Sequence, residues 1–253
     1  MYHISFSGGL GSAVSALAAH EAGFEFTLLF ADTKIEDEDL YRFVDDVSSA
    51  VGVPVTRLCD GRTPWQVFED KRYIGNTRTA HCSSELKTKP IKTWLDQNAA
   101  GDEPLVLGMD WSEQDRIDRA VARWSPRPVI SLLNELNVWR PDYAKILARF
   151  SIKPPRLYDL GFTHNNCGGF CVKAGKKQFA LLKNVFPERY AFHAAEMDRV
   201  MQSIGSTARP FLRHTHNKTT QYLTLNEYEK VLVAGADQQE DFDFAGCGCF
   251  TDD

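Results

Sequence analysis

Serine and glycine residues are concentrated near the N-terminus, in the segment Ser5-Phe6-Ser7-Gly8-Gly9-Leu10-Gly11-Ser12. An apolar run at residues 2–6 leads into this segment, and a helix-forming run at residues 12–21 follows it. Glycines let backbone N–H groups turn toward a bound anion, and a helix N-terminus adds the positive end of its dipole. The order of strand, glycine-rich segment and helix predicts a phosphate-binding loop. The alternative is a tight turn that binds no ligand. The segment lacks the Gly-Lys-Ser/Thr ending of a Walker A loop and the spacing of a dinucleotide fingerprint.

Four of the six cysteines form two close pairs, Cys167-Gly-Gly-Phe-Cys171 and Cys247-Gly-Cys249. Thiolates are soft ligands, and paired cysteines in glycine-rich loops commonly hold zinc or iron–sulfur centres. We therefore expect Cys167, Cys171, Cys247 and Cys249 to bind a metal. A redox-active pair and plain buried thiols are the alternatives.

Two basic runs accompany the cysteines, residues 173–177 and residues 209–218. Either run could contact a polyanion or the phosphates of a substrate, or be a solvated surface. The net charge of −5 gives no general sign of a nucleic-acid-binding protein.

Short apolar runs that predict strands alternate with helical periodicity through the first half of the chain. The strands are expected at residues 2–6, 24–31, 53–58 and 104–109, with helices at residues 12–21, 36–51 and 111–123 between or after them. This alternation predicts an α/β fold with a doubly wound, mostly parallel sheet. Ligands bind at the carboxyl ends of such strands, where Ser7–Ser12 and Asp32-Thr33 lie.

The simplest domain division is a nucleotide-binding core at residues 1–125 and a cysteine-bearing, mainly helical C-terminal portion at residues 126–253, packed on the core. A hydrophobic content of 43% over 253 residues is enough for a sizeable core. No apolar run reaches the ~20 residues of a membrane span, and no signal-peptide pattern precedes the loop, so we expect a cytoplasmic protein without a membrane partner.

Several short motifs, scattered over residues 2–175, together resemble the phosphoadenosine-phosphosulfate (PAPS) reductase branch of the PP-loop ATP pyrophosphatase superfamily. Besides the glycine loop, they are Phe30-Ala31-Asp32-Thr33 with Glu36, Cys82-x-x-x-Leu86-Lys87-x-x-Pro90-Ile91, Leu107-Gly108-Met109 with Glu113 and Arg116, and Leu157-Tyr158-x-x-Gly161-Phe162. The resemblance implies an adenine nucleotide alpha hydrolase-like fold that binds ATP with Mg²⁺.

Transferred to matching positions, the resemblance assigns roles to particular residues. The phosphates of ATP would be held by Ser7, Gly8, Gly9, Gly11 and Ser12, the adenosine would lie near Asp32 and Thr33, and Gly108 would let the backbone approach the nucleotide. The candidate catalytic residues are Lys87, Arg116 and Cys82. Cys82 matches a cluster-ligating cysteine of the adenosine-phosphosulfate reductases, which keeps an iron–sulfur cluster and a Zn²⁺ site equally open.

The chain departs from its relatives at two places. Leu10-Gly11 stands where many PP-loop pyrophosphatases carry Lys-Asp, and Cys247-Gly248-Cys249 does not match the Glu-Cys-Gly-x-His motif of PAPS reductases. The resemblance then implies an enzyme that cleaves ATP to AMP and pyrophosphate to adenylylate a substrate, for sulfur transfer or nucleic-acid modification.

A sulfonucleotide reductase and a non-catalytic nucleotide-binding or metal-sensing module are the alternatives. The implied partners are the adenine nucleotide and a nucleic acid or sulfur-donor protein. The oligomeric state stays open, with a homo-oligomer as one alternative.

Overall fold

A computed structural model describes residues 1–216 and 219–233, so Cys247 and Cys249 lie outside the described residues. Five parallel strands form one sheet in the order β3-β2-β1-β4-β5. Their bounds are β1 (Tyr2–Ser5), β2 (Phe26–Asp32), β3 (Val55–Cys59), β4 (Leu105–Val106) and β5 (Val129–Ile130). The predicted α/β class is confirmed.

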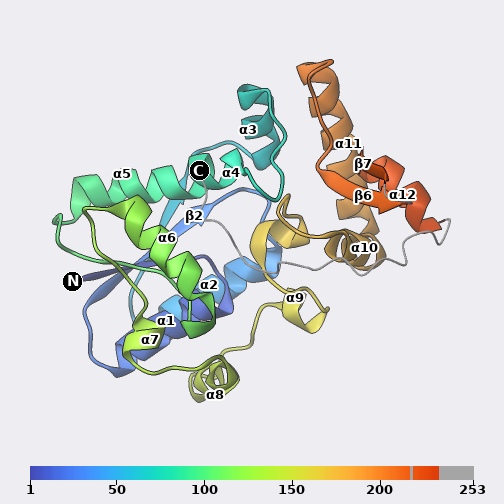
Figure 1. Cartoon of the computed structure of the whole chain (residues 1–253). Helices are drawn as coiled ribbons and strands as arrows, with labels where there is room; N and C mark the ends of the chain where they lie inside the picture. Colours follow the sequence, from blue (N-terminus) through green and yellow to red (C-terminus); the bar gives the residue numbers. More distant parts are fainter. Residues whose placement is uncertain (217–218, 234–253) are drawn as a thin grey trace.

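Helices cover both faces of this sheet (Figure 1), as expected for a doubly wound fold. One face packs on α1 (Leu10–Glu21), α2 (Glu38–Val51), α7 (Leu132–Glu135) and α8 (Tyr143–Arg149), and the other on α5 (Lys89–Asn98) and α6 (Gln114–Trp124). Successive side chains of a strand point to opposite faces. In β2, Leu28 and Phe30 therefore join the first cluster, whereas Leu29 joins the second.

The C-terminal residues form a second lobe, with a hydrophobic cluster of its own (Figure 1). It contains α9 (Arg156–Asp159), α10 (Lys176–Val185), α11 (Pro187–Ile204), the antiparallel hairpin β6 (Leu212–His216) and β7 (Thr219–Leu223), and α12 (Leu225–Val233). From the first half of the chain, α3 (Pro64–Lys71) contributes Trp65 and Phe68 to the same cluster. Short elements complete the description: α4 (His81–Ser83), the π-helix η1 (Ser84–Thr88), and the 3₁₀ turns η2 (Trp111–Glu113), η3 (Arg140–Asp142) and η4 (Asn166–Gly169).

A buried carboxylate joins the two parts of the molecule. Asp37, whose side chain is 1% exposed, accepts hydrogen bonds from Arg156 Nε at 2.8 Å and Arg189 Nη1 at 2.9 Å. Burial by itself would raise the pKa of Asp37, but the hydrogen bonds from both arginines outweigh it and hold that pKa below its usual value. Arg189 also donates to the Gly168 carbonyl at 2.7 Å, which ties α11 to the segment around Cys167.

The sheet continues beyond residue 125, because β5 is its fifth strand and α7 and α8 pack in the same cluster as α1. The division into residues 1–125 and 126–253 stays a prediction. Among the described residues, no helix has both the length and the apolar composition needed to cross a lipid bilayer.

Candidate nucleotide-binding site

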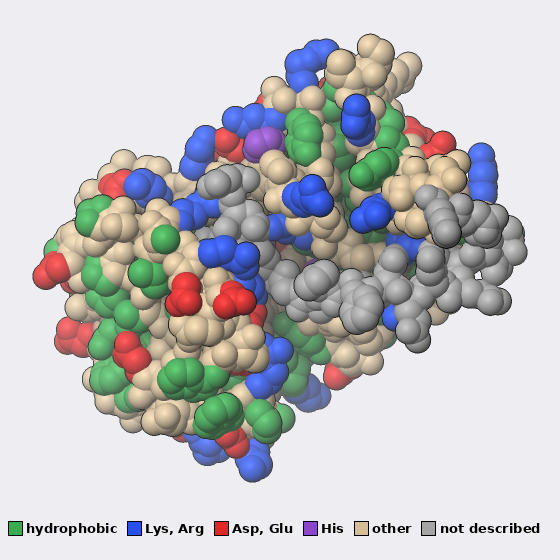
Figure 2. Space-filling model, in the orientation of Figure 1, with side chains coloured by type: hydrophobic (Ala, Val, Ile, Leu, Met, Phe, Trp, Pro, Cys, Tyr) green, Lys and Arg blue, Asp and Glu red, His purple; other side chains and the backbone are tan. Residues whose placement is uncertain are grey.

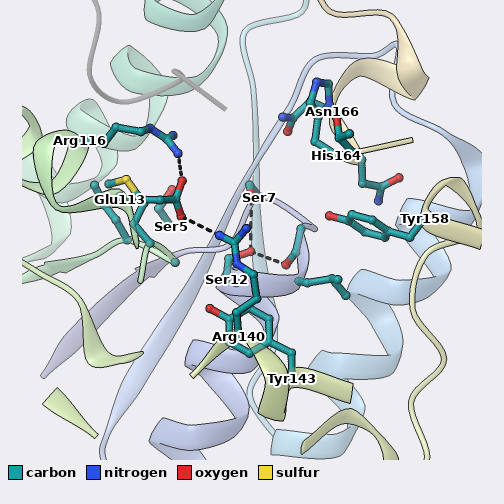
Figure 3. A pocket seen from close by; sticks show the side chains of 18 residues that line it. Ser5, Ser7, Ser12, Glu113, Arg116, Arg140, Tyr143, Tyr158, His164 and Asn166 are labelled. Atoms are coloured by element: carbon teal, nitrogen blue, oxygen red, sulfur yellow. Dashed lines mark hydrogen bonds and ion pairs between the residues drawn. The ribbon is translucent and has the colours of Figure 1, made fainter. Parts of the chain in front are cut away.

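The strand order places a crevice at the carboxyl end of β1. The chain passes from β1 to its neighbour β2 on one side, and β4 pairs with β1 on the other side. Ligands of open α/β sheets bind at such a topological switch point. A cavity of about 330 Å³ lies there, lined by the β1–α1 loop, by residues 107–109 after β4, and by residues 163–166 (Figure 3).

The β1–α1 loop presents backbone groups to this cavity. Gly8 has a positive φ of 74°, and α1 begins after Gly9 with no side-chain hydrogen bond capping its first turn. The first N–H groups of a helix lack partners within it, and Leu10, Gly11 and Ser12 all line the cavity. The loop predicted to hold phosphate therefore borders a hollow with unused donors. Its side-chain hydroxyls are close together, with Ser7 Oγ 3.3 Å from Ser12 Oγ.

Two glycines hold the loop against the end of β4. A Cβ atom on Gly11 would lie 2.2 Å from the Gly108 carbonyl oxygen, and one on Gly108 would lie 2.2 Å from the Ser12 nitrogen. Neither position has room for a side chain. Gly108 lines the cavity. A side chain at this position is excluded because the backbone of Gly108 packs against the backbone of Gly11 and Ser12. This contact accounts for the glycine at position 11.

A charged wall closes one side of the cavity (Figure 3). Glu113 pairs with Arg116, and its other oxygen lies 3.3 Å from Arg140 Nη2. Arg140 Nε also contacts Asp110 Oδ2 at 3.0 Å, and that oxygen accepts a hydrogen bond from the Tyr143 hydroxyl at 3.2 Å. Arg116 thus lies at the cavity, where the resemblance placed it. Arg140 and Tyr143 were missed, because they follow β5 in a stretch with no recognisable spacing.

The opposite wall consists of Tyr158, His164 and Asn166, with Asn165 beside them (Figure 3). Three buried polar atoms around the cavity have no hydrogen-bond partner among the described residues: Ser5 Oγ, His164 Nδ1 and Asn165 Oδ1. Burial, together with the charge of Lys87, lowers the pKa of His164 to about 4, so its imidazole is neutral at pH 7. Buried polar atoms normally have partners. Their gathering here therefore indicates a place for a polar ligand.

Asp32 and Thr33 lie at the carboxyl end of β2 but are not among the residues that line the cavity. Asp32 Oδ1 accepts hydrogen bonds from the Tyr41 hydroxyl and the Lys34 amide, each at 2.8 Å. Thr33 donates to Glu36 Oε1 at 2.8 Å. A role for these two residues in binding adenosine stays a prediction.

Behind the His164 wall, Glu36 is the centre of a buried polar cluster. Its carboxylate, 1% exposed, lies 3.6 Å from the Lys87 ammonium, which is 6% exposed. The second carboxylate oxygen accepts a hydrogen bond from the Cys167 amide at 2.5 Å. Lys87, predicted to be catalytic, therefore sits in η1 beside Glu36 and is not part of the cavity lining. The segment 163–167 connects the two places, because His164 lines the cavity and Cys167 binds Glu36.

The thiols of Cys82, Cys167 and Cys171 belong to this region. Burial raises the pKa of the Cys167 thiol well above its usual value, with further contributions from Glu36, Cys171 and Cys82. A metal ion requires deprotonated thiolates. Within residues 1–216 and 219–233, no three His, Cys, Asp or Glu side chains are grouped to hold a metal ion. The described residues therefore do not form a metal site by themselves, and the four-cysteine centre stays a prediction because Cys247 and Cys249 lie outside them.

Relatives of this chain are found among known proteins. Two proteins of Methanocaldococcus jannaschii, the uncharacterized proteins MJ0973 and MJ0066, are each 26% identical over 192 residues. The matches cover 74% and 73% of this chain but only 45% and 39% of those relatives, so the chain spans less than half of their length.

A crystal structure of phosphoadenylyl-sulfate (PAPS) reductase from Candida auris, a phosphate complex, is similar with a TM-score of 0.45 and 15% identity. That similarity covers 64% of this chain and 77% of the other. The family model of the phosphoadenosine phosphosulfate reductase domain matches residues 1–125, which carry the glycine loop, Lys87 and Arg116. Residues 1–125 therefore match the PAPS reductase domain, which makes this chain similar to the PAPS reductase-like branch of the PP-loop superfamily.

Proposed function

We propose that this protein is an enzyme that binds ATP in the cavity after β1 and cleaves it between the α and β phosphates to adenylylate an acceptor. One observation carries the proposal: the glycine loop and three residues with unpartnered buried polar atoms line one cavity at the switch point of the sheet. The volume of about 330 Å³ is within the range of small-molecule sites.

The loop and the arginines supply what a polyphosphate requires. The first N–H groups of α1 and the hydroxyl of Ser7 would donate to phosphate oxygens. On the charged wall, Arg116 and Arg140 now share Glu113, and a polyphosphate would compete for their guanidinium groups.

In the proposed reaction, an acceptor nucleophile forms a bond to the α phosphorus and the bond from that phosphorus to the bridging oxygen breaks. Pyrophosphate leaves with the electron pair and gains negative charge. Positioned cations stabilise such charge, the main electrostatic contribution in phosphoryl chemistry. Arg116 and Arg140 are the residues of the cavity suited to this role.

Mg²⁺ bound to ATP is held mainly by phosphates and takes one or two protein carboxylates. Glu113 is the sole carboxylate among the described residues that line the cavity, and it fits this requirement. When bound, Mg²⁺ would neutralise part of the charge on the phosphates.

Sulfur transfer is the finer form of this proposal. It is supported by the thiols of Cys82, Cys167 and Cys171, which lie together beside the His164 wall. The His164 imidazole is neutral and its Nδ1 has no partner among the described residues. This nitrogen could form a hydrogen bond that holds the acceptor substrate in place.

Ser5→Ala is the sharpest test of the cavity. The Ser5 hydroxyl has no partner among the described residues, so its removal should leave the free protein as stable as before. Losing one hydrogen bond to the ligand should weaken ATP·Mg²⁺ binding roughly three- to tenfold, measured by isothermal titration calorimetry. Ser48→Ala is the matched control, because Ser48 lies on α2 and does not line the cavity. Its hydroxyl already has a partner, the Val53 carbonyl at 2.8 Å.

Product analysis tests the reaction. With β,γ-methylene-ATP, cleavage at the proposed bond yields AMP and methylenediphosphonate, detected by ³¹P NMR. Failure of ATP to bind would overturn the proposal. Sulfite release from PAPS in the presence of thioredoxin would replace it with a sulfonucleotide reductase, which the match to the PAPS reductase domain favours as the second candidate. Tight binding with no cleavage of ATP or PAPS would identify a non-catalytic binding module.

A further inference from the structure

A second hollow, larger than the nucleotide cavity, lies on the C-terminal lobe. It has a volume of about 760 Å³ and is bordered by the loop at residues 76–79, by residues 174–176 and by the β6–β7 hairpin. A smaller hollow of about 350 Å³ shares Tyr73, Asn76 and Tyr222 with it. The two hollows therefore adjoin each other, and together we name them the basic groove.

The charge of this groove differs from that of the chain. Its described lining includes no aspartate or glutamate, but it does include five cations: Arg72, Arg78, Lys176, Arg209 and Arg213. The chain as a whole has 34 acidic residues against 29 Lys and Arg. Figure 2 shows Lys and Arg side chains over this lobe, with hydrophobic side chains among them. A concentration of cations without carboxylates in an acidic protein points to an anionic ligand.

The hairpin presents an aromatic ring and a cation on one face. Arg213 of β6 pairs directly with Tyr222 of β7, and directly opposed residues of an antiparallel pair share a face. The next pair, Leu212 and Leu223, points the other way into the C-terminal cluster. Strand alternation therefore buries the leucines and leaves Tyr222 55% exposed in the groove.

The facing loop holds a second tyrosine in place. Tyr73 is 39% exposed, its hydroxyl accepts a hydrogen bond from Asn76 Nδ2 at 2.6 Å, and its ring meets His81 edge-on with centroids 5.5 Å apart. The side-chain oxygen of Asn76 accepts the Arg78 amide at 2.8 Å, which orders the backbone next to that cation. The groove thus carries two exposed tyrosines, Tyr73 and Tyr222, among arginines.

We propose that the basic groove binds single-stranded nucleic acid. Exposed aromatic rings on which bases stack, set among cations that follow the phosphates, are the combination that single strands require. A duplex keeps its bases stacked inside and offers no faces to Tyr73 and Tyr222. The proposal names the class of acceptor for the adenylylation proposed above, and to that extent it rests on the proposed function.

The groove adjoins the cysteine region of the candidate site. Ala174, which lines the groove, donates its amide to the Cys171 carbonyl at 2.8 Å. His81, against which Tyr73 rests, directly precedes Cys82 in the chain. A nucleic-acid strand bound in the groove would therefore lie near the cysteine region. Cys167 of that region donates its amide to Glu36.

Binding can be measured on the full chain by fluorescence anisotropy, with labelled RNA and DNA single strands of about 12 nucleotides and the corresponding duplexes. We expect single strands to bind in a salt-dependent manner and more tightly than duplexes. Tyr222→Ala should weaken binding about tenfold. Arg78→Gln with Arg213→Gln should reduce the slope of log K against log salt by about 1.4, because two phosphate contacts are lost.

Matched controls lie elsewhere on the surface. Phe192→Ala removes an equally exposed ring (53%), and Lys145→Gln removes a cation that is 80% exposed. Neither change should alter oligonucleotide affinity. Absence of binding, preference for duplexes, or equal losses in the control variants would overturn the proposal. The RNA and DNA strands show which sugar the groove accepts.

The two proposals fail separately. Ser5→Ala should weaken ATP binding and leave oligonucleotide binding unchanged, whereas Tyr222→Ala should do the reverse. Oligonucleotide binding without ATP binding would reject the nucleotide site and retain the groove. ATP cleavage without oligonucleotide binding would reject the groove alone.

Discussion

The nucleotide cavity and the basic groove are hollows of opposite construction. The cavity is lined in part by backbone at the switch point of the sheet, where Gly11 and Gly108 have no room for a side chain. The groove is lined by tyrosine and arginine side chains on a hairpin and a loop. The first is inseparable from the fold, because the same atoms that would bind phosphate also pack the sheet. The second is a surface placed on a core that does not depend on it.

This difference has a consequence for mutation. Changes at the two glycines of the cavity should affect folding and binding together, whereas changes at the exposed side chains of the groove should affect binding alone. Three single substitutions and one double substitution should change the stability of the protein by progressively smaller amounts.

Gly11→Ala should have the largest effect. The new Cβ would lie 2.2 Å from the Gly108 carbonyl, and backbone on both sides cannot move without shifting β4. We expect a loss of about 3 kcal/mol in the free energy of unfolding, measured by urea denaturation, together with loss of ATP binding. Gly101→Ala is the control, because nothing lies within 4 Å of its added Cβ. A Gly11→Ala protein of normal stability would contradict the backbone-built cavity.

Asp37→Asn tests the junction between the two parts. It removes the charge that binds Arg156 and Arg189, and we expect a loss of roughly 2 kcal/mol, since Arg156 is partly exposed. Because the pKa of Asp37 is lowered on folding, its contribution is complete above pH ~4 and is lost as the pH falls through the folded value. Urea denaturation of both proteins from pH 7 to pH 3 measures this difference. Asp46→Asn, in an exposed pair with Arg42, should change stability by less than about 1 kcal/mol. Equal effects of the two substitutions would contradict the junction.

Burial keeps two histidines neutral, His164 at the cavity and His193 on α11 of the C-terminal lobe. It lowers the pKa of His164 to about 4 and that of His193 to about 3. The unfolded chain takes up these protons near pH 6.5, so stability should fall below that pH, by about 2 kcal/mol for each histidine between pH 6.5 and 5. His193→Phe should remove its share of this dependence, measured by urea denaturation at pH 7 and 5. An unchanged pH dependence would show that His193 titrates normally. The variant also loses the acceptor of Trp65 Nε1, so its stability at pH 7 is the reference.

The combined substitution of Arg213→Gln and Tyr222→Ala should have the smallest effect on stability. Both side chains lie on the outer face of the hairpin, so we expect the free energy of unfolding to stay within about 0.5 kcal/mol of that of the unsubstituted protein. Leu212→Ala, one residue away on the inner face, should cost about 3 kcal/mol. Thermal unfolding by circular dichroism compares the variants. A large loss from the outer pair would mean that the groove is part of the core.

Much of the molecule was predictable from local sequence patterns. Apolar runs and helical periodicity located four of the five parallel strands and several of their helices, and the order of residues 5–12 predicted the loop that borders the cavity. Arg116 and Gly108 were also placed at the site by the resemblance, and both line the cavity. Such features depend on neighbours in the chain, which the sequence displays directly.

The remaining features depend on contacts between distant residues. Arg140 and Tyr143 reach the cavity only because β5 adds to the sheet edge beside β4. Glu36 becomes the partner of Lys87 and Cys167 across separations of 51 and 131 residues. Similarly, Arg78 and Tyr222 line the same groove although they lie far apart in the sequence.

The sequence by itself determined the class of fold, the position of the glycine loop and the family resemblance, because strand and helix periods and glycine turns are local properties. The tertiary structure decided which charges meet in the cavity, that Lys87 is buried beside Glu36 outside the cavity lining, and that the basic runs form a groove with tyrosines. These are consequences of packing, since burial and pairing free energies depend on distances that only the folded chain sets.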